Sequence, residues 1–364
     1  MLIELLPYIG LLLLTIIIPT LFNKKVYMFL LFLVFFVFCG FRYGVGWDYF
    51  NYCETLELGG WRIEKSEFLI RQLELFCDKH GFVQFFFVAT SFFTLLFYFW
   101  AISKESMNPG VSVFVFLTVP FLFFHSLTTI RFSLAVSMVF LACHFAYKKQ
   151  YIPYLALLVA SVLTHQAALF GVLTIPFVLK KIRFGISLNM SIFIVCFVFG
   201  VVIGSFSFIS SVFNVLLDNS FLSEFVSDAE TYMTDKEGAG FSRTPYLYAI
   251  VNVVNLFTMK KMAKNNDGLE QNNMLEHYVT MFNIGCSLMF LFSFHGTFAS
   301  RLSQFFMVYI LLIVPYYKKL SVQQIMVYSI FLFAFFYQLT IMTYHPDFVG
   351  RLNCWLPYRM NFSF

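Results

Sequence analysis

A long series of apolar segments, separated by short polar breaks, dominates the sequence. A helix that spans a bilayer needs about 20 mostly apolar residues. Hydrophobic residues make up 60% of the chain and charged residues 12%, against about 25% charged in ordinary soluble domains. The chain is therefore predicted to be an all-α polytopic membrane protein, with one transmembrane domain over residues 1–364 and about 12 transmembrane helices. The predicted segments are 3–22, 26–41, 82–102, 111–127, 129–147, 151–164, 167–179, 186–216, 244–259, 277–294, 299–316 and 322–343.

The charges divide unequally between the two sides that twelve crossings define. One side carries 13 basic and 4 acidic residues, a net charge of +9, and the other side carries −4. The positive-inside rule identifies the first side as the cytoplasm. Both termini, the long loops 42–81 and 217–243 and the tail 344–364 are then expected on the outer, periplasmic side. No basic cluster is longer than a pair plus one neighbour, which excludes nucleic acid as a partner.

The kind of cation also differs between the sides. Twelve of the 13 cytoplasmic cations are lysine, whereas eight of the 11 outer cations are arginine. Arginine binds phosphate through a planar fork of donors and keeps its charge. Snorkelling at the membrane surface explains any single arginine, but it does not explain why the inner cations are lysines. The pattern predicts an anionic ligand on the outer side. The eight arginines are Arg42, Arg62, Arg71, Arg131, Arg243, Arg301, Arg351 and Arg359.

A glycine- and aromatic-rich stretch, residues 41–52, directly follows the second predicted segment. Gly44 and Gly46 allow a tight turn or a close approach of the backbone, and the aromatic side chains offer faces for sugar rings. Arg42 and Asp48 supply opposite charges. The alternative interpretation is an aromatic belt at the membrane surface, closed by an Arg–Asp pair.

Two predicted outer turns carry polar residues at membrane depth, where such groups are costly and often functional. His125 and Arg131 lie in the first turn and His165 in the second. Asp228, Glu230, Asp235 and Glu237 have the loose spacing of a metal site, but they lie in a solvated acidic loop of little other character. We therefore predict no metal and no other cofactor.

Several stretches, taken in order, resemble the EpsG-like branch of the bacterial Wzy-type O-antigen and exopolysaccharide polymerases. Residues 42–52 resemble the first motif of that family, and Ser300 to Phe306, with Arg301 at its centre, resemble a later arginine motif. Residues 130–135, 147–149 and 164–169 resemble the central block. Phe132 departs from the pattern, because a glutamine is expected after the arginine.

The resemblance implies a GT-C-like membrane glycosyltransferase of the bacterial inner membrane, with its active site facing the periplasm. Such enzymes move the growing glycan from undecaprenyl diphosphate onto the non-reducing end of a lipid-linked repeat unit. The implied partners are that lipid-linked oligosaccharide and the bilayer, and whether a chain-length regulator also binds is left open. The expected site residues are Arg42, Arg131, Arg243 and Arg301 for the diphosphate, Trp47, Tyr49 and Tyr52 for sugars, and Asp48 or His165 as the general base.

Two other functions are alternatives to a polymerase for these sequence features. A ligase would use the same lipid-linked donor with another acceptor, and only the resemblance separates it from a polymerase. A flippase for the same lipid is less favoured, because transporters usually contain internal repeats and polar sites near the bilayer midplane, and this sequence contains no repeat.

Overall fold

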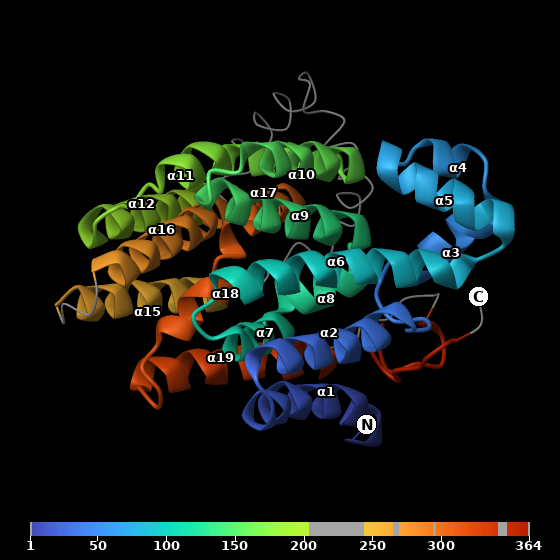
Figure 1. Ribbon diagram of the computed structural model, residues 1–364, viewed down its shortest axis with the longest axis horizontal. Coiled ribbons are helices and arrows are strands. Elements are labelled where there is room, and N and C mark those ends of the chain that lie inside the picture. The colour runs from blue at the N-terminus through green and yellow to red at the C-terminus, as the bar shows by residue number, and fades with distance from the viewer. Residues whose placement is uncertain (1, 204–243, 265–268, 294–295, 341–347, 363–364) are drawn as a thin grey trace. The chain divides into compact units, whose positions relative to one another are not determined.

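The computed structural model describes residues 2–203, 244–264, 269–293, 296–340 and 348–362. The regular elements among these residues are all helices (Figure 1), apart from one isolated bridge between Arg42 and Met360. The predicted all-α class is confirmed. The chain divides into two compact units, one comprising Met1–Ala168 and Phe331–Phe364 and the other Leu169–Ile330.

The described residues of the first unit form ten complete helices and the end of α19. They are α1 (Leu2–Leu21), α2 (Lys24–Gly40), α3 (Tyr49–Leu58), α4 (Trp61–Glu64), α5 (Phe68–His80), α6 (Val83–Glu105), α7 (Pro109–Thr118), α8 (Pro120–Thr128), α9 (Ile130–Tyr147) and α10 (Tyr151–Thr164).

The second unit contains most of the remaining elements, and η1 and α19 each cross between the units. The elements are η1 (Gln166–Thr174), α11 (Ile175–Lys180), α12 (Ile186–Ile203), α15 (Thr244–Lys264), α16 (Leu269–Leu291), α17 (Gly296–Met307), α18 (Ile310–Ile313), η2 (Val314–Tyr316) and α19 (Val322–Thr340).

Several helices have the length and apolar character of membrane spans. Among the described residues, five stretches qualify, namely α1, α6, α9, α17 through η2, and α19. A sixth is added if the bent pair α7 and α8 counts as one span. These helices agree with a multi-pass membrane protein.

The predicted segment 111–127 is two helices rather than one. Helix α7 ends at Thr118 and α8 begins at Pro120, with a bend of 63° between them. Val119 is extended, with φ −87° and ψ 113°. Proline disfavours helical geometry in the residue before it and lacks the amide hydrogen that would continue the ladder. Pro120 therefore accounts for the break.

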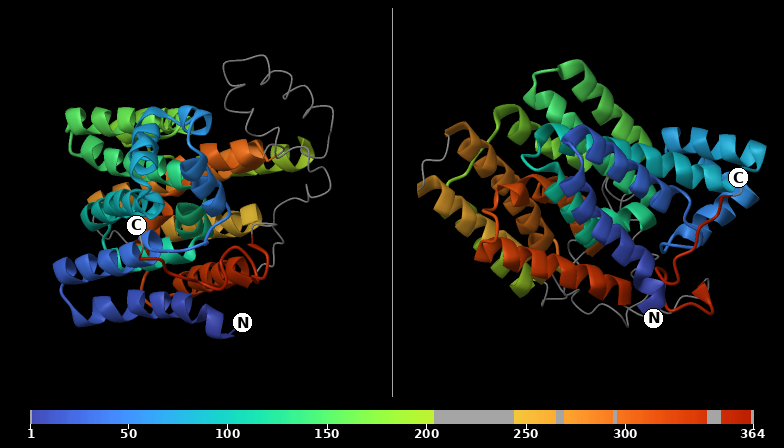
Figure 2. Two further views of the ribbon diagram at one scale, coloured as in Figure 1. Left: turned by 90° about the vertical axis from the view of Figure 1, so that its right-hand side faces the viewer. Right: turned by 60° about the horizontal axis from the view of Figure 1, so that its bottom comes forward.

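In the first unit, α6 packs against both α2 and α9, and α9 packs along α10 (Figures 1 and 2). The three short helices α3, α4 and α5 follow α2 and lead into α6. Phe35 of α2 contacts the rings of Phe99, Phe116 and Phe123 from α6, α7 and α8. These apolar contacts hold the spans on which the loop 41–81 rests.

In the second unit, buried asparagines link three helices. Asn252 of α15 donates to Asn283 Oδ1 at 2.8 Å, and Asn283 of α16 donates to Asn189 Oδ1 of α12 at 3.1 Å. All three residues are fully buried. Buried polar groups are costly unless they are hydrogen-bonded, so this chain of amides fixes how α12, α15 and α16 meet.

Candidate functional site

Most of the residues expected at the site belong to the first unit. These are Arg42, Trp47, Asp48, Tyr49, Tyr52, Arg131 and His165. Arg301 lies on α17 in the second unit. Arg243, with the acidic loop that contains Asp228 and Glu237, lies outside the described residues. The convergence of all four arginines on one ligand therefore stays a prediction.

Arg42 is fully buried, and its guanidinium is surrounded by protein atoms. It donates to three backbone carbonyls and one hydroxyl, and it lies over an aromatic ring. The partners are Cys39 O, Val45 O at 3.2 Å, Leu127 O at 3.3 Å, Ser91 Oγ at 3.2 Å and the Phe87 ring at 5.1 Å from its centroid. This set ties the turn after α2 to α6 and α8. Arg42 therefore has the surroundings of a structural residue, which differs from the diphosphate contact expected from the sequence.

Gly46 lies close to the backbone of Leu127 in α8. Its φ is +103°, and a Cβ there would meet Leu127 O at 2.1 Å. The Gly46 amide donates to Cys354 O at 3.0 Å, and Arg351 donates to Gly44 O. The C-terminal segment 348–362 thus packs onto the glycine turn, which the sequence did not reveal.

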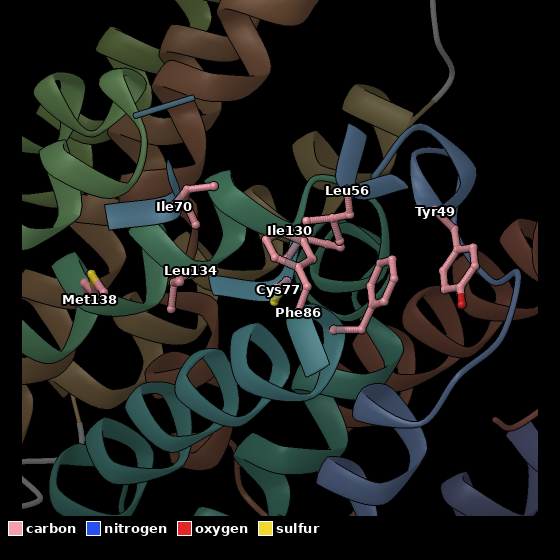
Figure 3. Close-up of a cluster of buried hydrophobic side chains, with 9 residues drawn as sticks. Tyr49, Leu56, Ile70, Cys77, Phe86, Ile130, Leu134 and Met138 are labelled. Atoms are coloured by element: carbon pink, nitrogen blue, oxygen red, sulfur yellow. The ribbon is translucent and has the colours of Figure 1, made fainter. Parts of the chain in front are cut away.

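A hydrophobic cluster joins the short helices to the spans (Figure 3). It contains side chains of α3, α5, α6 and α9. The buried members are Tyr49, Leu56, Ile70, Cys77, Phe86, Phe87, Ile130, Leu134 and Met138. Burial of this kind contributes about 25 cal/mol per Å² of apolar surface removed from water. The cluster thus fixes α3 and α5 against the first turn of α9, where Arg131 follows Ile130.

The predicted sugar-binding aromatics have different surroundings. Tyr49 is 2% exposed and stacks on Phe87 at 4.4 Å between ring centroids, so its faces are covered. Tyr52 is half-buried, with its ring 5.2 Å from that of Phe86. Trp47 is half-buried and contacts the edge of Phe348 at 6.4 Å. Tyr52 and Trp47 thus retain some exposure, whereas Tyr49 belongs to the core.

Arg131 forms an ion pair with Glu67, a residue that sequence reasoning missed. Nη1 of Arg131 donates to Oε2 of Glu67 at 3.0 Å. The side chains are 29% and 14% exposed. Glu67 directly precedes α5, has an extended backbone and makes no side-chain cap bond to its own helix. Its carboxylate is therefore available to α9.

His165 lies on the other side of the same carboxylate. Its Nδ1 is 3.7 Å from Oε1 of Glu67, and the Gln166 amide donates to that oxygen at 3.2 Å. The Ala167 amide donates to His165 Nδ1 at 3.1 Å. Phe132, which departs from the family pattern, packs edge-on against the His165 ring at 5.6 Å. The predicted Arg131 and His165 are thus brought together by one glutamate.

Two neighbours extend this cluster. Burial raises the pKa of the Tyr52 phenol, whereas the Arg131 guanidinium lowers it and the charge of Asp48 raises it further. Asp48 thus lies within electrostatic reach of Tyr52. We call Arg131, Glu67, His165, Tyr52 and Asp48 the arginine–glutamate cluster.

Glu74 is a second acid that was not expected. It lies two helical turns after Glu67, is 1% exposed, and its Oε2 has no hydrogen-bond partner. Burial raises its pKa, and Glu67 adds to the rise, whereas Ser66, Arg131 and Arg71 oppose it. The only sequence feature that indicates a buried acid here is the position of Glu74 on the apolar face of the amphipathic helix α5, between Ile70 and Cys77.

Within the described part of the chain, no group of three or more His, Cys, Asp or Glu side chains is placed to hold a metal ion. The arginine–glutamate cluster therefore offers one partly exposed guanidinium, two carboxylates, one imidazole and one phenol. Such a set can bind an anion and move a proton.

No curated protein and no solved structure matches this chain. The model of the EpsG family matches residues 25–360, which is nearly the whole length, and the protein therefore belongs to the EpsG family.

Proposed function

We propose that this protein is a polysaccharide polymerase of the Wzy type. It would transfer the growing glycan from a polyprenyl diphosphate to a hydroxyl at the non-reducing end of a lipid-linked repeat unit. Membership of the EpsG family supports a role in polysaccharide biosynthesis, and the apolar helices suit a lipid-linked substrate. The observation that carries the proposal is the arginine–glutamate cluster, which three separate segments of the first unit build around Arg131.

The transition state of this reaction develops negative charge on the departing diphosphate. A fixed guanidinium stabilises that charge without reorganising when the reaction occurs. Arg131 is 29% exposed and already oriented by Glu67, so an incoming anion can reach it. Arg301 and Arg243 are part of the proposal as further diphosphate contacts. Tyr52 and Trp47, which keep some exposure, are proposed to contact the sugars.

The proposal includes the membrane arrangement. It places about 12 spans in a GT-C-like fold in the bacterial inner membrane. Both termini and the arginine–glutamate cluster would face the periplasm. The unequal charges of the two sides support this orientation. Labelling of single introduced cysteines from each side of the membrane tests it.

The direct test is reconstitution of the purified protein in vesicles, with a polyprenyl-diphosphate-linked repeat unit as the sole substrate. A polymerase gives a ladder of glycans longer than one repeat. A ligase gives no ladder and consumes the donor only when a different acceptor is added. A flippase moves the lipid across the bilayer without forming a bond. Absence of a ladder with the intact protein contradicts the proposal.

A further inference from the structure

The transfer requires a group that takes the proton of the acceptor hydroxyl. Three members of the arginine–glutamate cluster can take up a proton in principle: Glu67, His165 and Asp48. The contacts of these three side chains show which of them is suited to act as the base. The inference below rests on the proposed glycosyl transfer and identifies the base within it.

His165 is held as a hydrogen-bond donor. Its Nδ1 accepts the Ala167 amide at 3.1 Å, which uses the nitrogen lone pair of that atom. A neutral imidazole has one donor and one acceptor nitrogen, so this bond assigns the ring hydrogen to Nε2. A nitrogen that carries its hydrogen cannot take another from a hydroxyl, but it can donate to an anion. His165 therefore suits contact with a phosphate or sugar oxygen.

Asp48 occupies the residue before α3 and makes no side-chain cap bond there, and its charge acts on the phenol of Tyr52. Glu67, in contrast, lies 3.0 Å from the guanidinium expected to bind the leaving group.

We infer that Glu67 is the general base of the transfer. Its two oxygens have different partners: Oε2 accepts from Arg131, and Oε1 accepts from the Gln166 backbone amide. A carboxylate accepts about four hydrogen bonds in all, so each oxygen retains room for an acceptor hydroxyl. The side chain is 14% exposed, which leaves a path for that hydroxyl.

The reaction balances with this assignment. The Glu67 carboxylate takes the proton of the acceptor hydroxyl, and the hydroxyl oxygen forms the new bond to the anomeric carbon of the donor. The bond from that carbon to the diphosphate oxygen breaks, and its electron pair leaves with the polyprenyl diphosphate. Glu67 then releases the proton to water when the products separate.

The test compares Glu67→Gln with wild type in the vesicle assay, together with binding of undecaprenyl diphosphate alone. The amide oxygen of glutamine still accepts from Arg131 in the place of Oε2, whereas its NH2 group replaces the oxygen that accepts from the Gln166 backbone amide, so the bond to Arg131 is kept while the base is lost. We expect polymer formation to fall by roughly 100- to 10,000-fold, the usual contribution of a general base, with binding changed by less than about threefold. The matched control is Glu54→Gln, which makes the same change in an Arg62–Glu54 pair of the same 3.0 Å length outside the cluster.

A second variant separates a base from a residue that only orients its neighbours. Glu67→Ala is expected to be inactive and to regain activity when formate is added, because formate supplies a carboxylate in the vacated space. Full activity in Glu67→Gln, or loss in Glu67→Ala that formate does not reverse, overturns the assignment of Glu67. Absence of polymer with wild type instead overturns the proposed function, so the two failures are distinguishable.

Discussion

Nη1 of Arg131 lies 3.0 Å from Oε2 of Glu67, although the two residues are 64 positions apart in the chain. Arg131 begins a span, whereas Glu67 precedes an amphipathic helix of the loop 41–81. The apolar cluster beneath them, which includes Ile70 and Ile130, holds the two segments together. The apolar cluster thus keeps Arg131 and Glu67 next to each other.

Arg131→Lys should strongly reduce polymer formation while the protein stays folded in the membrane. Lysine keeps the charge but loses the planar fork that binds a diphosphate. Removal of one such donor typically lowers the rate by about 100- to 1,000-fold, measured as product ladder in the vesicle assay. The control is Arg62→Lys, since Arg62 is similarly exposed and pairs with Glu54 at the same distance. Equal activity in both variants contradicts a role for Arg131 in the reaction.

Arg42→Met, in contrast, should lower the stability of the folded protein. Methionine roughly fills the space of the arginine but donates no hydrogen bond, so Val45 O and Leu127 O lose a donor in a buried site. Each buried carbonyl left without a partner costs about 1 to 3 kcal/mol. We expect a lower thermal unfolding temperature in detergent and less protein in the membrane. A stable Arg42→Met protein that no longer binds undecaprenyl diphosphate would instead support the role expected from the sequence.

The helices could be predicted from the sequence because the spacing of apolar runs and polar breaks follows from the bilayer itself. Arg131 and His165 could be chosen because polar groups at the ends of spans are costly. Glu67 could not, since it is one of many acids in a polar loop, and only the fold shows which one meets Arg131. Arg42 carries the same sequence signal as Arg131, and only its burial distinguishes them.

Gly46→Ala should destabilise the protein more than a change at another glycine with positive φ. A methyl group at Gly46 would lie 2.1 Å from Leu127 O, and the backbone on both sides is held. Gly81 also has a positive φ, +70°, in the left-handed helical region, but nothing lies within 4 Å of its Cβ position. Gly81→Ala should therefore cost only the left-handed strain, about 1 to 2 kcal/mol. Thermal unfolding of the two variants in detergent checks this, and equal losses would show that the approach to Leu127 relaxes freely.

Glu74→Gln should stabilise the protein at neutral and higher pH and change little in acid. Burial and Glu67 raise the pKa of Glu74 above its ordinary value of 4.5, so the folded protein favours the protonated carboxyl. The stability that this carboxyl contributes is fully present below pH 4.5 and is lost as the pH rises through the higher, folded value. Glutamine cannot ionise, so the difference in unfolding temperature between variant and wild type should grow with pH. A difference that is the same at every pH would show that Glu74 acts through its hydrogen bonds rather than through its proton.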